Sequence, residues 1–268
     1  MRRSTFLLVP ALFWACNSDT FVGDDGGPDT GSDVVVGGGE GGSSDGGNLK
    51  DVTPTPKRFC QEVDAQFCAD FDIPEDAGAG FAPPLTSGGW SFAFQDAQAK
   101  SSPKAVQIDT AADSGGAALI ENPGLSANVA NGPAKRMVVE LDAYLPSLSF
   151  TPDPIFVFRA GVIPAKPLTY GLAAHVGMWK LAGGTSPVTL SPQPPTDQWV
   201  HVVLGIDINS NVGNVTLDIG SSHAAAQVPT GVDGGATYPG YVAVGGEDQY
   251  IPQNAVTFYV DNVVVRWQ

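Results

Sequence analysis

The sequence predicts an all-β domain built as a sandwich of two sheets, and three observations support this. Short segments that alternate between apolar and polar residues follow one another through residues 58–268, separated by turn residues. The chain of 268 residues contains 33 Gly and 22 Pro, and helical periodicity is scarce. The stretch of about 200 residues that carries this pattern has the length of one all-β domain.

Residues 1–15 have the pattern of an export signal. Arg2 and Arg3 give a positive start, and the apolar run Phe6–Trp14 is too short to span a bilayer, which needs about 20 residues. Ala15 and Cys16 resemble the end of a lipobox, the site where a bacterial lipoprotein signal is cut before a lipid-bearing cysteine. The sequence therefore predicts a lipoprotein signal peptide and lipidation of Cys16, with an ordinary secretory signal as the alternative. Because Asn17, not Asp, follows the cysteine, we expect an outer-membrane lipoprotein of the cell envelope.

Residues 16–57 are predicted to form a disordered linker. They are rich in Gly, Asp and Ser and nearly free of large apolar side chains, so they cannot bury enough surface to order themselves. The next two cysteines, Cys60 and Cys68, flank QEVDAQF at the start of the ordered domain. In an exported chain with three cysteines, they are the natural disulfide pair once Cys16 carries lipid.

Two segments predict half-buried strands and a third predicts a central one. RMVVELDAYL places Val139, Leu141, Ala143 and Leu145 on one face, and WVHVVLGIDI places five apolar residues inward, which are Val200, Val202, Leu204, Ile206 and Ile208. VTFYVDNVVVRW is apolar on both faces, as expected for a strand in the middle of a packed sandwich. Trp199 and Trp267 are also expected to pack inward.

In order, FCADFD, KAVQID, AALIENP, RMVVELDAYL, DQWVHVVLGIDI, NVTLDIG, GYVAVGG and FYVDNVVV resemble a concanavalin A-like domain of the lectin/glucanase or laminin-G kind. The resemblance implies a two-sheet antiparallel jelly-roll sandwich over residues 58–268. The cysteine pair with its ADFD opening also resembles uncharacterised secreted lipoproteins of the myxobacterial kind.

The enzymes of this fold provide two motifs for comparison. Glycosidases of the family carry Glu-x-Asp-x-(x)-Glu, of which this chain has Glu140 and Asp142 but not the second glutamate that acts as acid and base. Lyases of the fold share an Arg, a Gln-x-His and a Tyr-rich strand, a set that this sequence does not display. On these grounds the sequence predicts that the domain is not an enzyme.

The resemblance also implies a structural calcium between the first and last strands. Asp261 lies at the matching place, and Asp72, with Asp70 or Glu75, is the expected partner. The alternative is that Asp261 and Asn262 satisfy loop amides without an ion. No other cofactor is required.

The function predicted from the sequence is non-catalytic carbohydrate binding on the concave face. Aromatic rings and a few polar groups bind glycans in such sites, and the predicted ligand-binding residues are Glu140, Asp142, Tyr144, Arg159, Tyr170, Trp179 and His201, with Trp90 as a further aromatic. Residues 58–268 hold 20 acidic and 9 basic residues without a basic cluster, which disfavours nucleic acid and leaves the lipid as the only membrane contact. The alternatives are a glycoside hydrolase or polysaccharide lyase with a non-standard site, and a structural or protein-binding module.

Overall fold

The computed structural model confirms the predicted all-β class. It describes residues 59–72, 81–101, 103–112, 115–125, 128–129, 132–148, 154–162, 168–183, 186–208, 212–229, 239–248 and 254–268. The predicted signal peptide, the lipidated Cys16 and the linker lie outside these residues. The described part contains one single-turn helix, α1 (Phe59–Glu62), and no helix in it is long and apolar enough to cross a membrane.

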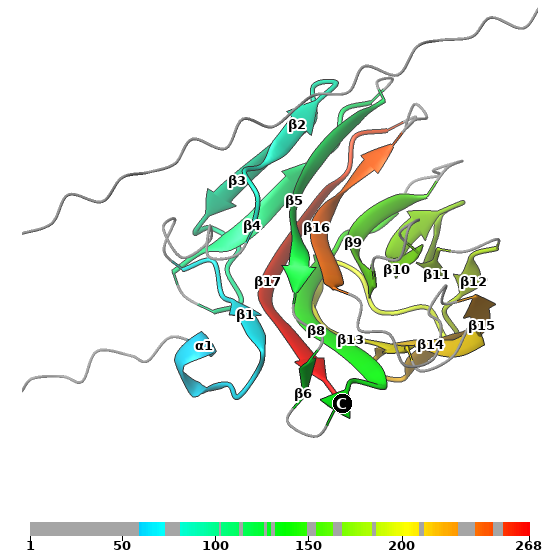
Figure 1. Ribbon diagram of the computed structural model, residues 1–268. Coiled ribbons are helices and arrows are strands. Elements are labelled where there is room, and N and C mark those ends of the chain that lie inside the picture. Colours follow the sequence, from blue (N-terminus) through cyan, green and yellow to red (C-terminus); the bar gives the residue numbers. More distant parts are fainter. Residues whose placement is uncertain are drawn as a thin grey trace, which may run out of the picture. The chain divides into compact units, whose positions relative to one another are not determined.

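The strands form two main antiparallel sheets, as predicted (Figure 1). The order in the eight-stranded sheet is β15 (Ser222–Pro229), β14 (Val212–Ile219), β13 (Gln198–Asp207), β8 (Arg136–Leu145), β17 (Thr257–Trp267), β4 (Ala105–Asp109) and β3 (Ser91–Gln95), with β1 (Phe67–Ala69) also pairing with β17. The order in the seven-stranded sheet is β12 (Val188–Thr189), β11 (Met178–Ala182), β10 (Leu168–His175), β9 (Ile155–Val162), β16 (Gly240–Asp248), β5 (Gly116–Leu125) and β2 (Leu85–Ser87). A small hairpin joins β6 (Asn128–Val129) and β7 (Gly132–Pro133).

The core lies between the inner faces of the two sheets, where the alternating residues of neighbouring strands meet. The inward residues predicted for β8 and β13 are confirmed: Leu141 and Val202 are fully buried in the core cluster, and Val200 packs against it. The central position predicted for β17 is confirmed too, because it pairs with β8 on one side and with β4 and β1 on the other.

Figure 1 shows the eight-stranded sheet curving around the seven-stranded one. The free face of the seven-stranded sheet is therefore concave, and the free face of the eight-stranded sheet is convex. Both free faces carry the residues that point away from the core, so each strand gives every second side chain to one of them.

The predicted disulfide between Cys60 and Cys68 is present, with a Cα–Cα distance of 5.6 Å. It ties α1 to β1, and β1 pairs in turn with the C-terminal half of β17, through Cys68 opposite Val264. The bridge thus anchors the start of the described domain to its last strand.

Candidate functional site

The concave face of the seven-stranded sheet carries an acid beside a phenol. Glu121 on β5 and Tyr241 on β16 point away from the core, and the Tyr241 hydroxyl donates a hydrogen bond of 3.1 Å to Glu121 Oε2. The Tyr241 ring is 9 % exposed, because it packs with Ala117, Leu119 and Ala243 in a small apolar cluster separate from the main core. The ring is therefore fixed, and its hydroxyl is held at the carboxylate.

Arg159 on β9 lies beside this pair. It pairs directly with Ala243, while Tyr241 pairs with Gly161, two residues further along the same two strands. Residues two apart on adjacent strands share a face, so Arg159 and Tyr241 are diagonal neighbours. The Arg159 guanidinium carbon also lies 5.5 Å from the centre of the Phe156 ring, and this contact helps to orient it.

Small residues separate Arg159 from the next cation, Lys180 on β11. Gly171 on β10 pairs with Arg159, and Ala173 on β10 pairs with Lys180. Gly171 has no room for a side chain, because a Cβ there would lie 1.9 Å from the carbonyl oxygen of Phe158. The floor between the two cations is therefore low, and the described part of this face combines two cations with the Glu121–Tyr241 pair.

Four of the seven predicted ligand residues come together on the opposite, convex face. His201 on β13 lies between two carboxylates of β8, with Nε2 3.6 Å from Glu140 and Nδ1 3.4 Å from Asp142. Arg266 on β17 also pairs with Glu140. The fourth residue, Tyr144, stands two positions further along β8.

Tyr144 is the middle of a row of three aromatic rings on the convex face. It pairs directly with Trp199 on β13 and with Tyr259 on β17. The ring centres are 6.0 Å and 5.7 Å apart, and both contacts are edge-to-face. Burial, followed by the charges of Asp109 and the neighbouring Tyr144, raises the pKa of the Tyr259 phenol. Because Trp199 belongs to this outward row, it lies half-buried on the outer face, and its predicted inward packing is wrong. Trp267 is buried, as predicted.

The remaining predicted residues are divided between the core and the concave face. Tyr170 and Trp179 are each 2 % exposed and belong to the main core, as does Trp90, so these rings are not available to stack on a ligand. They alternate with outward residues of β10, β11 and the segment before β3, and the sequence does not reveal which alternate set faces inward. Burial raises the pKa of the Tyr170 hydroxyl. Arg159 alone lies on the concave face, so the structure splits the predicted site.

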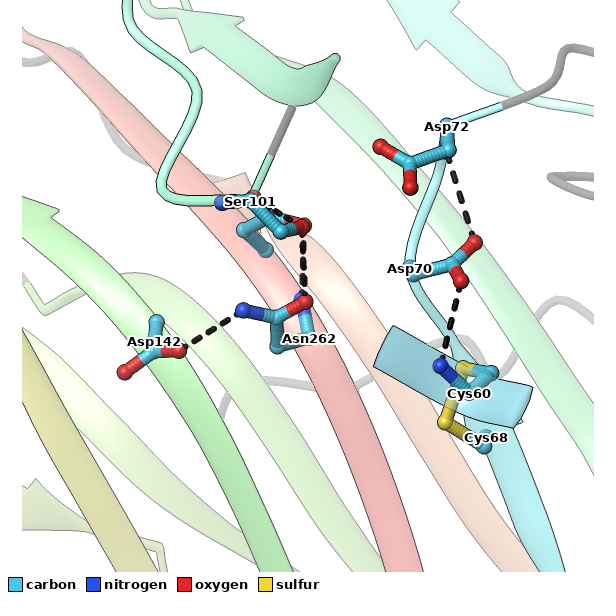
Figure 2. Close-up of a disulfide and its surroundings, with 8 residues drawn as sticks. Cys60, Cys68, Asp70, Asp72, Ser101, Asp142 and Asn262 are labelled. Carbon is cyan, nitrogen blue, oxygen red and sulfur yellow. Dashed lines mark hydrogen bonds between the residues drawn. A yellow bond between two sulfur atoms is a disulfide. The ribbon is translucent and has the colours of Figure 1, made fainter. Parts of the chain in front are cut away.

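Of the two predicted calcium ligands, Asp261 has both carboxylate oxygens taken by backbone and hydroxyl donors, and Figure 2 shows its neighbours Ser101 and Asn262 together with the other predicted ligand, Asp72. Asp261 Oδ2 accepts hydrogen bonds from the amides of Lys100 and Ser101 and from the Ser101 hydroxyl, and Asp261 Oδ1 accepts from the Asn262 amide. Asp72 Oδ1 accepts a longer bond of 3.4 Å from the Lys104 amide. Donors on both Asp261 oxygens fit the amide-satisfying alternative better than a cation, and the described residues contain no group of three potential metal-ligating side chains.

Asp261 is nevertheless an unusual acid. It is fully buried, and burial outweighs its hydrogen bonds and raises the pKa of its carboxyl to about 7. Asn262, which has a positive φ of 54°, links it to the convex face by donating a 2.9 Å bond to Asp142 Oδ2. The bulge that breaks the β8–β17 register between Asp261 and Val264 creates this arrangement.

Sequence reasoning missed Glu121, Lys180 and Tyr241. The signal for Tyr241 is present, because Tyr241 and Ala243 alternate with the core residues Val242 and Val244. What the sequence lacks is the strand order, since β16 pairs with β5 and β9, which are far from it along the chain.

The comparisons with known proteins concern the fold. No protein-family model and no curated protein matches the sequence. Among solved structures, the endo-β-1,4-glucuronan lyase of the fungus Trichoderma reesei matches with a TM-score of 0.54 and 12 % identity, over 76 % of this chain and 96 % of that one. Alginate lyase vAL-1 from Chlorella virus matches with a TM-score of 0.50 and 7 % identity, over 76 % of this chain and 100 % of that one. The domain therefore has the sandwich fold of these lyases.

These matches contradict the expectation that the domain is not an enzyme, because the structures it resembles are enzymes. That expectation rested on two motifs read along the sequence. The incomplete set at Glu140 and Asp142 concerns glycosidases only, and it lies on the convex face. A lyase site assembled from several strands does not have to appear as one linear motif.

Proposed function

We propose that the domain is a polysaccharide lyase that cleaves a uronate-containing polymer on the concave face of the seven-stranded sheet. The observation that carries the proposal is the Tyr241–Glu121 hydrogen bond beside the Arg159 side chain. An acid–phenol pair next to a cation provides the two functions that elimination at a uronate requires. The two matching structures are a glucuronan lyase and an alginate lyase, which agrees with this class of substrate.

β-Elimination breaks the C5–H bond of the uronate and the bond between C4 and the glycosidic oxygen, and it forms a C4=C5 double bond. The electron pair of the C5–H bond becomes the new π bond, and the electron pair of the C4–O bond leaves with the oxygen. The C5 proton goes to a base, and the leaving oxygen takes up a proton from an acid. No water or cofactor is consumed.

The residues of the concave face match these needs. The Arg159 guanidinium pairs with the uronate carboxylate and stabilises the negative charge that develops there when the C5 proton is removed. Tyr241 takes the C5 proton as its own hydroxyl proton passes to Glu121. Tyr241 then protonates the leaving oxygen, and Glu121 returns the proton to Tyr241, so both residues end as they began.

Lys180 gives the site a second point of attachment. It stands two strands from Arg159, about 10 Å across the sheet, and two residues further along the strands, about 7 Å, which gives a separation of about 12 Å. This is roughly the length of a disaccharide, so a polymer crossing the strands could present a second carboxylate to Lys180. We therefore favour a substrate with repeated uronate units.

The test is an elimination assay with purified protein on glucuronan, alginate and polygalacturonate, followed by the ultraviolet absorbance of the unsaturated product. Tyr241→Phe is expected to lower kcat by about 10²–10⁴-fold, the usual contribution of a general acid–base group. Arg159→Met is expected to abolish activity and Arg159→Lys to restore part of it. Arg266→Met, the same substitution on the convex sheet, is the control. Absence of unsaturated product from all three polymers, or full activity of Tyr241→Phe, would refute the proposal.

We further propose that the protein works outside the cytoplasm, attached by a lipid on Cys16. The Cys60–Cys68 disulfide supports an oxidising compartment. Metabolic labelling with a fatty acid tests this: label in the wild type that Cys16→Ser removes is the expected result, and an unlabelled, secreted wild type contradicts it.

A further inference from the structure

We propose that the convex face of the eight-stranded sheet carries a second carbohydrate-binding surface, formed by the ring row Trp199–Tyr144–Tyr259, which holds an uncharged, extended polysaccharide. The row lies on the opposite sheet from Tyr241 and Arg159, so this surface is separate from the proposed catalytic face. It would keep the enzyme on a neutral polymer while the concave face acts on a uronate polymer.

The row is straight, because its three rings stand directly opposite one another on three adjacent strands, β13, β8 and β17. Strands lie about 4.8 Å apart, so the outer rings are about 10 Å apart, roughly the length of a disaccharide. None of the three rings belongs to the core cluster, and each is half-buried. Edge-to-face contacts with the Tyr144 ring hold both outer rings in place, so a ligand meets rings that are already ordered.

Polar side chains flank the row on both sides. On one side, the next residues of β13 and β8 on the same face are His201, whose side chain is 57 % exposed, and Asp142. On the other side, Asp109 accepts hydrogen bonds from Ser91 and Thr257. Apolar rings with donors and acceptors along both edges match a sugar ring, which has apolar C–H faces and hydroxyls around its rim.

The charges of this face decide which glycan it takes. Around the row lie the carboxylates of Asp109, Asp142 and Glu140, and Glu140 is already paired with Arg266. In the described part of the convex face, the carboxylates around the row therefore repel an anionic polymer, and little positive charge is left to attract it. An uncharged polymer avoids this penalty, which distinguishes the surface from the concave face with its Arg159 and Lys180.

Affinity electrophoresis of the full-length protein tests this surface. Native gels contain hydroxyethylcellulose, galactomannan or xylan, with polygalacturonate in a parallel gel. Retardation of the wild type in at least one neutral gel is expected, and Trp199→Ala or Tyr144→Ala should weaken the retardation constant about tenfold, the typical cost of removing an aromatic anchor. Tyr144→Phe keeps the ring and should retain binding. Val212→Ala, which alters an exposed apolar residue at the end of β14, is the control.

Folding of each variant is checked by near-ultraviolet circular dichroism and by its thermal transition, which separates lost binding from lost structure. No retardation in any neutral gel, equal retardation of a folded Trp199→Ala protein, or retardation in polygalacturonate alone would each overturn the proposal. The proposed lyase activity is measured in a separate assay, so either idea can fail without the other.

Discussion

Replacing Asp261 with Asn should remove a pH dependence from the stability of the fold. The carboxyl is fully buried and its pKa lies at about 7 in the folded state, against an ordinary value of 3.8 for a solvated Asp. Between these two values the folded state holds a proton that the unfolded state has released. Folding is therefore favoured at low pH, and stability falls as the pH rises toward 7.

The size of the effect follows from the two pKa values. Each pKa unit corresponds to about 1.4 kcal/mol, so raising the pH from 5 to 7 should cost the wild type about 2 kcal/mol through Asp261, with little further loss above pH 8. In the Asn variant the amide does not titrate and its oxygen can still accept from Ser101. The variant loses the bond from the Asn262 amide, which costs about 1 kcal/mol at every pH.

Urea unfolding in EDTA at pH 5, 6, 7 and 8 measures this difference. Asp96→Asn, which removes an exposed carboxylate after the end of β3, controls for the loss of one charge. If wild type and Asp261→Asn lose stability in parallel between pH 5 and 7, the reasoning from burial is wrong. Repeating the series with calcium tests the calcium prediction: a gain in Tm that Asp261→Asn abolishes would establish an ion at this carboxylate, and no gain would leave its oxygens to the backbone amides.

Two further substitutions test the architecture. Replacing both Cys60 and Cys68 with Ala removes the cross-link between residues at a sequence separation of 8. This should lower the free energy of unfolding by about 2–3 kcal/mol, and with it the Tm. An unchanged Tm under non-reducing conditions would contradict the anchoring role of the bridge. Gly171→Ala should prevent folding to soluble protein, because the new Cβ would lie 1.9 Å from the Phe158 carbonyl oxygen. In the control Gly124→Ala the new Cβ meets its nearest neighbour at 4.0 Å, so this variant should fold. A soluble Gly171→Ala protein with an unchanged Tm would show that β9 and β10 can separate freely.

The fold could be predicted because the sandwich imposes a local signal on each strand. On β8, Val139, Leu141 and Ala143 alternate with polar residues, and this pattern alone specifies the face that is buried. The same logic failed for Tyr170 and Trp179. Tyr170 lies between Thr169 and Gly171, and Trp179 lies between Met178 and the long-stemmed Lys180, so the alternation does not mark either set as inward.

The site could not be predicted because a face is made by strands that are distant in sequence. Glu121 and Tyr241 are 120 residues apart and meet only because β16 returns between β5 and β9. Glu140 and Asp142 stand out as a motif because they are close together on one strand, and that closeness guarantees only that they share a face. It does not specify which sheet the strand joins, and here the strand joins the convex one.

The division of polar residues between the two free faces follows from how each sheet is stabilised. On the convex face, cross-strand partners satisfy one another: Arg266 with Glu140, His201 with Asp142, and Tyr144 with two rings. Such pairs stabilise the sheet and also fix side chains for a neutral ligand. On the concave face the floor is small, and Arg159, Lys180 and the Glu121–Tyr241 pair stand on different strands around it. Above this low floor there is room for the proposed polymer, whose carboxylates would then reach Arg159 and Lys180 from the solvent side.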